Sequence, residues 1–119
     1  MNCGIFCVRK YFELISYDGS EIIRQLQSHV SNRGLSVLDI VDVMNRNGFE
    51  CVAYYDRKVC YEFPYIMYDA VYHHYYLVAD GDDRYVYIYD RNLGEMRLFR
   101  WFFRFIWSKY YVSVRRSVI

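Results

Sequence analysis

The stretch GFECVAYY, residues 48–55, decides the fold class, because the pattern of the chain changes within it. Gly48 is a natural end for a helix that precedes it. Beyond this glycine apolar residues alternate with polar ones, a period of two that is typical of a strand, at Phe49, Cys51, Ala53 and Tyr55. We therefore expect helices before residue 48 and a sheet after it.

The part before Gly48 is predicted to hold three helices, because apolar residues recur there at helical spacing. The expected bounds are residues 3 to about 16, 20 to about 29 and 37 to about 47. The side chain of Asn2 is expected to cap the first helix, and that of Ser20 the second. Ser36, with Asp39 three residues later, is typical of a capping box at the start of the third.

The part after Gly48 is predicted to form strands separated by polar turns. Besides the first strand, the expected strands are residues 65–68, 74–79, 85–89 and 110–114, with turns at 80–83 and 92–94. Because helices come first and strands follow, the sequence predicts an α+β fold with a largely antiparallel sheet. We expect a single domain over residues 1–119.

The composition agrees with a folded domain and argues against one class of partner. The chain is 55% hydrophobic and 24% charged, and it contains 15 tyrosines, a residue that favours half-buried strand positions. The formal net charge is +1, so no general attraction to nucleic acid is indicated. We expect no nucleic-acid partner.

The most apolar stretch of the chain is LFRWFFRFIW, residues 98–107. It contains two arginines in ten residues, whereas a transmembrane helix needs about 20 mostly apolar residues. No membrane span is therefore expected. If the stretch is helical, Arg97, Arg100 and Arg104 lie on one side, and two interpretations stay open: a basic amphipathic helix that rests on a membrane or another domain, or a surface helix that packs its aromatic residues on the sheet.

The four cysteines do not form a metal-binding pattern. Three residues separate Cys3 from Cys7 and eight separate Cys51 from Cys60, and neither spacing is that of a zinc site. No basic segment followed by an apolar one marks a secretory signal, so we expect a cytoplasmic protein with reduced thiols. Cys7, Cys51 and Cys60 are expected to be packed or incidental, and no metal or cofactor is expected.

Cys3 is different because it stands at the predicted start of a helix. The positive partial charge of a helix N-terminus favours the nucleophilic thiolate. Gly4 follows it, and a glycine there lets a substrate backbone approach, so the backbone amides of Cys3 and Gly4 are candidates for an oxyanion hole. The alternative is that Cys3 is a small buried hydrophobe.

A thiolate nucleophile needs a base and a group that orients the base. His73 and His74 precede a hydrophobic strand, and strand geometry lets only one of them face a site. Asp90 ends the strand 85–89, where a carboxylate can fix the imidazole tautomer. Cys, His and Asp in this order suggest a papain-like arrangement, although a wet loop and a turn-forming aspartate explain the last two as well.

Several motifs resemble those of the bacteriocin-processing, double-glycine leader peptidases, in the order in which that family has them. The matching motifs are NCGIFC at 2–7, GLSVLDIV at 34–41, NGFE at 47–50, PYI at 64–66, HYYLV at 74–78 and VYIYD at 86–90, with Gly94 and Trp107 beyond. The resemblance covers nearly the whole chain.

This resemblance implies a papain-like fold and a cysteine endopeptidase that cuts a leader peptide after a Gly-Gly or Gly-Ala pair. It implies no metal, and a precursor peptide as substrate. In most members the domain precedes an ABC transporter, so transporter domains are implied as partners. The matching positions are Cys3 as nucleophile, His74 as general base and acid, and Asp90 as the orienting residue; His74 rather than His73 abuts the hydrophobic strand as the family histidine does.

The chain departs from the family pattern at three places. Asn2 and Arg91 stand where the family commonly has Asp and Pro. The family usually has a glutamine several residues before the cysteine, whose amide completes the oxyanion hole, and only Met1 and Asn2 precede Cys3 here. Three interpretations follow: the sequence is truncated at its start, the donor comes from elsewhere, or the domain docks leader peptides or regulates a transporter without cutting.

Overall fold

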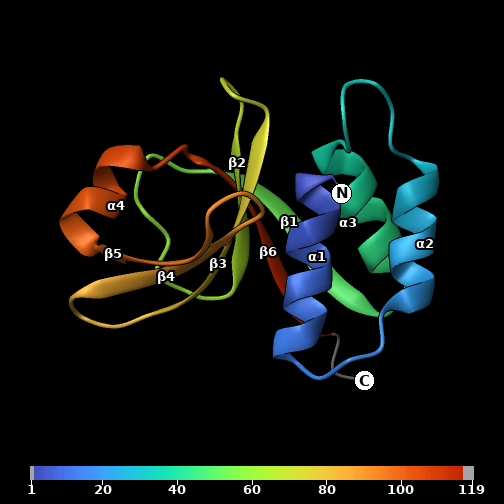
Figure 1. Ribbon diagram of the computed structural model, residues 1–119, viewed down its shortest axis with the longest axis horizontal. Helices are drawn as coiled ribbons and strands as arrows, with labels where there is room; N and C mark the ends of the chain where they lie inside the picture. The colour runs from blue at the N-terminus through green and yellow to red at the C-terminus, as the bar shows by residue number, and fades with distance from the viewer. Residues whose placement is uncertain (1, 117–119) are drawn as a thin grey trace.

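The structure, a computed structural model, describes residues 2–116 and places three helices before a six-stranded sheet (Figure 1). The helices are α1 (Cys3–Leu14), α2 (Ser20–Ser28), α3 (Val37–Arg46) and α4 (Arg100–Ile106). The strands are β1 (Phe49–Tyr55), β2 (Tyr65–Asp69), β3 (His74–Gly81), β4 (Tyr85–Asp90), β5 (Gly94–Phe99) and β6 (Tyr110–Arg116). The strand order is β1-β6-β2-β3-β4-β5, and all neighbours are antiparallel.

The caps observed at the starts of α1, α2 and α3 confirm two of the three predicted caps. The Asn2 side chain accepts from the first turn of α1, and the Ser36 hydroxyl accepts from the Asp39 amide at the start of α3, both as expected. The prediction that Ser20 caps α2 is wrong. Ser20 is the first helical residue, and its amide and hydroxyl both donate to the Asp18 carboxylate.

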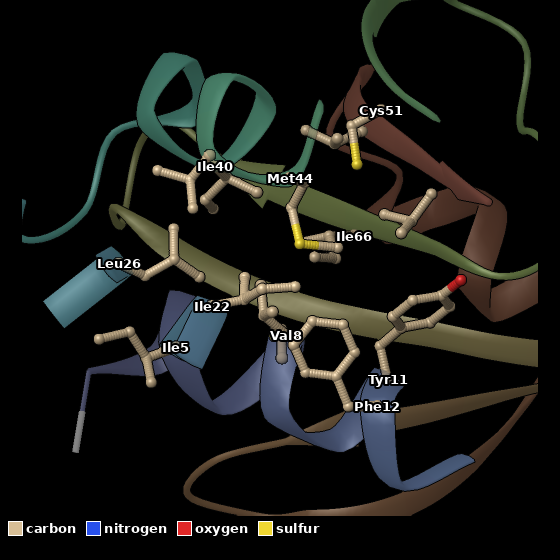
Figure 2. Close-up of a cluster of buried hydrophobic side chains, with 14 of the residues drawn as sticks. Ile5, Val8, Tyr11, Phe12, Ile22, Leu26, Ile40, Met44, Cys51 and Ile66 are labelled. Carbon is tan, nitrogen blue, oxygen red and sulfur yellow. The ribbon is translucent and has the colours of Figure 1, made fainter. Parts of the chain in front are cut away.

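Helices α1–α3 cover one face of the sheet and enclose the larger hydrophobic core (Figures 1 and 2). Val8, Phe12, Leu26 and Met44 are buried in it, facing Ile66 of the sheet. An aromatic group closes one end, where the rings of Phe12 and Tyr17 lie 5.5 and 5.2 Å from that of Phe49. The residue at which the sequence pattern changes is thus held by the helical layer.

A second core lies between α4 and the other face of the sheet, formed by Tyr65, Met67, Val78, Val86, Ile88, Phe103 and Trp107. The expected helix around residues 97–107 is shorter than the sequence suggested, because Gly94–Phe99 pairs with β4 as an edge strand. Arg97 is therefore a strand residue, and α4 begins at Arg100. Within residues 2–116 no helix combines the length and apolar character needed to cross a bilayer.

Two leucines test how much the helical layer contributes to stability. Leu26 on α2 is fully buried, whereas Leu38 on α3 is 77% exposed. We expect Leu26→Ala to lower the free energy of unfolding by about 2–5 kcal/mol, because it leaves a cavity in the larger core. The matched change Leu38→Ala should cost less than about 0.5 kcal/mol. Denaturant unfolding followed by circular dichroism measures both, and equal losses would contradict the described packing.

Candidate active site

Cys3 is the first residue of α1, and its side chain is partly exposed. The Asn2 Oδ1 accepts from the amides of Gly4 and Ile5, at 2.8 and 3.3 Å. This cap starts the helix immediately before the cysteine, so the thiol sits where the helix dipole favours negative charge. The position of Cys3 is the one that the sequence predicted.

Gly4 is buried because the helix start is pressed against the sheet. A Cβ atom at Gly4 would lie 3.3 Å from the Tyr75 ring and 3.1 Å from the Asn2 Oδ1. The Tyr75 hydroxyl donates to the Leu35 carbonyl at 2.6 Å. One tyrosine of β3 therefore touches α1 and also holds the loop before α3.

The amide of Gly4 does not serve as the sequence suggested. It already donates to Asn2 at 2.8 Å, so it is not a free oxyanion donor in this structure. The Cys3 amide is the first of α1 and has no acceptor among residues 2–116. Of the two backbone amides predicted to form the oxyanion hole, the Gly4 amide is paired with the helix cap and the Cys3 amide is left without an acceptor in the described part of the chain.

His74, the first residue of β3, and Asp90, the last residue of β4, meet at the end of this strand pair that is opposite to its hairpin, as their sequence positions indicated. The His74 Nε2 contacts the Asp90 Oδ1 directly. Asp90 is 2% exposed, and its Oδ2 accepts from the Leu93 amide at 2.9 Å. The carboxylate is thus fixed by the turn that follows β4 while its other oxygen faces the imidazole.

The contact with Asp90 determines which ring nitrogen of His74 can act as a base. A carboxylate accepts from Nε2–H, and in the neutral imidazole the lone pair is then on Nδ1. The ring also packs edge-on against Tyr76, with centroids 4.6 Å apart. The imidazole is therefore held on two sides, with Nδ1 as the nitrogen that takes up a proton.

The neighbouring His73 has different surroundings. It has a positive φ of 51° in the turn before β3, and its Nδ1 lies 3.1 Å from the Tyr68 hydroxyl. Its side chain is exposed. Of the two adjacent histidines, only His74 contacts Asp90 in the part of the chain that the structure describes.

The buried thiol of Cys7 is affected electrostatically by both Cys3 and Asp90. Burial raises the pKa of Cys7 well above its usual value, and the nearby charges of Cys3 and Asp90 raise it further. Burial also raises the pKa of Tyr76, with contributions that include Asp90 and Cys3. Helix α1, which begins with Cys3, packs on β3 and β4, the strands that carry His74 and Asp90.

Sequence reasoning missed the contribution of Tyr75 and Leu35. They are 40 residues apart, and no local pattern links them. The available signal was the small residue at Gly4, which implies a close neighbour but does not identify it. The tyrosine becomes apparent only when α1 is placed on β3.

The chain matches one known protein family in sequence and several solved structures in fold. The family model for the peptidase C39 family matches residues 1–118. The structure is similar to a double glycine motif protease from an AMS/PCAT transporter in complex with the leader peptide, with a TM-score of 0.80 and 17% identity over 98% of this chain and 85% of that one. No curated protein sequence matches significantly.

A second solved structure shares the fold. It is the peptidase domain of Streptococcus ComA, a bi-functional ABC transporter involved in quorum sensing, with a TM-score of 0.73 and 16% identity over 98% of this chain and 92% of that one. These similarities confirm the predicted α+β architecture of helices followed by a largely antiparallel sheet.

The helix cap at Asn2 gives a first test of the site. We expect Asn2→Ala to lower the free energy of unfolding by about 1 kcal/mol, because the amides of Gly4 and Ile5 lose their acceptor. Asn2→Ser should retain most of the stability, since serine is a comparable cap. Denaturant unfolding of both variants is the measurement, and an equal loss in both would contradict the capping role.

Thiol reactivity gives a second test. With Cys60, which is partly exposed, replaced by serine, iodoacetamide at neutral pH should modify Cys3 alone. Cys7 and Cys51 are buried, and burial raises the pKa of Cys51 to about 12, so both should react only after unfolding. Peptide mass mapping locates the label, and native labelling of Cys7 or Cys51 would contradict the described burial.

Proposed function

Since the chain belongs to the peptidase C39 family, we propose that Cys3, His74 and Asp90 are its catalytic residues and that it cleaves a leader peptide after a Gly-Gly or Gly-Ala pair. The direct contact between His74 and Asp90 is the observation that carries the assignment, because the carboxylate orients the imidazole so that it can act as a base. The partly exposed thiol at the start of α1 supplies the nucleophile.

The reaction follows from these roles. The Cys3 thiol transfers its proton to the Nδ1 of His74, and the sulfur attacks the carbonyl carbon of the scissile bond. The oxyanion accepts from the Cys3 amide. The imidazolium, stabilised by Asp90, gives its proton to the leaving amine as the C–N bond breaks. A water molecule, deprotonated by His74, then hydrolyses the thioester and restores the thiol.

A cavity next to the start of α1 is a suitable place for the leader segment. It measures about 380 Å³ and is lined in part by Leu35, Tyr68, His73 and Tyr75. Its lining residues Tyr75 and Gly34 lie against Gly4 and the Asn2 side chain, so the cavity borders the residues on either side of Cys3. We expect a leader that runs from this cavity to Cys3 to carry small residues there, since a larger side chain against the Tyr75 ring would clash.

The two solved neighbours support the substrate and partner classes. One is a double glycine motif protease in complex with a leader peptide, and the other is the peptidase domain of an ABC transporter. By analogy, the substrate here is a bacteriocin-like precursor with a double-glycine leader. The partner is an ABC transporter that exports the mature peptide from the cytoplasmic side.

A second function is favoured by one specific observation. The Gly4 amide is paired with Asn2, so the described residues offer the Cys3 amide alone at the helix start as an oxyanion donor. Loss of one such donor typically costs on the order of 10²–10³ in rate. A domain that binds leader peptides, or regulates a transporter, without cutting them is therefore the alternative.

The adjacent histidines provide a matched test of cleavage. The substrate is a synthetic peptide with a leader that ends in Gly-Gly, and products are identified by mass spectrometry. We expect Cys3→Ala and His74→Ala to abolish cleavage, and Asp90→Asn to slow it by on the order of 10²–10⁴ because the imidazole loses its charged partner. His73→Ala should retain far more activity than His74→Ala, since His73 contacts Tyr68 and lines the proposed leader cavity but does not contact Asp90.

Binding separates the two functions. Fluorescence anisotropy with a labelled leader measures affinity for the wild type and for Cys3→Ala. Cleavage that disappears in Cys3→Ala while affinity is kept supports the peptidase. Binding without cleavage by the wild type supports the docking function. Cleavage that survives in Cys3→Ala would refute the assignment of the nucleophile.

A further inference from the structure

The end of the molecule around α4 exposes a group of large apolar side chains. Phe99, Trp101, Phe102, Phe105 and Ile106, here called the α4 surface, are between 39% and 87% exposed. Only Phe103 and Trp107 of this segment are buried against the sheet. The expectation that the helix packs its aromatic residues on the sheet is thus correct for two residues and wrong for the others. Exposed apolar groups of this size commonly mark a binding surface.

Arginines border the α4 surface. An open cavity of about 660 Å³ is lined by Tyr61, Tyr85, Phe99 and Trp101 together with Arg84, Arg100, Arg104 and Asp83. Three arginines and one aspartate give this lining a formal charge of +2. Whatever covers the α4 surface is therefore expected to carry negative charge beside apolar groups.

Arg100 has one hydrogen-bond donor without an acceptor among the described residues. Its guanidinium lies over the Tyr61 ring, 3.9 Å from the centroid. Its Nε is buried and has no hydrogen-bond partner among the described residues. Arg100 also lines the open cavity, and a planar guanidinium is shaped to bind two oxygens of a phosphate.

We propose that the α4 surface binds an anionic lipid bilayer, with its aromatic side chains at the level of the headgroups and a lipid phosphate in the arginine-lined cavity. Tryptophan and phenylalanine together with arginine are the residues that settle at a membrane interface. In Figure 1, α4 lies at one end of the molecule and α1–α3 lie at the other. A bilayer can therefore meet α4 while α1, which carries Cys3, stays in water.

Vesicle co-sedimentation tests this proposal on the whole chain. The protein should pellet with vesicles of equal parts phosphatidylglycerol and phosphatidylcholine, not with pure phosphatidylcholine, and high salt should weaken binding. Phe105→Ser removes a side chain that is 87% exposed and should reduce partitioning about tenfold or more. Arg104→Gln should reduce it by roughly fivefold, because one cation near the surface is lost.

Matched variants at the opposite end serve as controls. Leu38→Ser on α3 and Arg24→Gln on α2 change side chains that are 77% and 76% exposed, and both should bind vesicles like the wild type. All variants should keep the wild-type circular dichroism spectrum. Their activity on the leader peptide is measured separately, so failure of lipid binding is distinguishable from failure of the peptidase.

Three results would overturn the proposal. The first is absence of binding to phosphatidylglycerol vesicles. The second is binding that Phe105→Ser and Arg104→Gln leave unchanged. The third is self-association of the lipid-free protein in sedimentation velocity that Phe105→Ser abolishes, because the α4 surface would then be an interface between two copies of the chain.

Discussion

The contact of the Tyr75 ring with Gly4 is the constraint on which the site depends. It sets the distance between α1 and β3, and the hydroxyl of the same tyrosine holds the Leu35 carbonyl. Because His74 precedes Tyr75, the packing that fixes the helix start also fixes the strand that carries the histidine. Because even a Cβ at Gly4 would lie 3.3 Å from the Tyr75 ring, a larger residue there would require α1 or β3 to shift.

Cys3 and Cys7 lie one helical turn apart on α1 and differ in how far their thiols are buried. Cys3 is partly exposed at the start of α1, while Cys7 is fully buried in the larger core. Burial and the neighbouring charges raise the pKa of Cys7, so it stays protonated and inert at neutral pH. The same residue type is thus accessible to solvent at the helix end and part of the core one turn later.

The sequence predicted the features that depend on local spacing and residue type, which are the first three helices, most of the strands and two helix caps. The change of pattern at Phe49 follows from spacing, and the cap at Asn2 follows from the residue type at a helix start. The choice of His74 over His73 rests on the family resemblance. Strand β5 was missed because the aromatic residues that follow Leu98 suggested one continuous helix, whereas pairing with β4 decides the matter. The use of the Gly4 amide and the bond from Tyr75 to Leu35 depend on tertiary packing, which no local pattern records.

The two carboxylate oxygens of Asp90 have different partners: Oδ1 contacts His74, and Oδ2 accepts from the Leu93 amide in the turn. A descendant of this domain that stopped cutting peptides would still need the aspartate for its hairpin. An aspartate at this position is therefore a poor marker of activity in distant relatives. The histidine, whose described contacts are with Asp90 and Tyr76, is the more informative one, and its loss would mark the passage from an enzyme to a binding module.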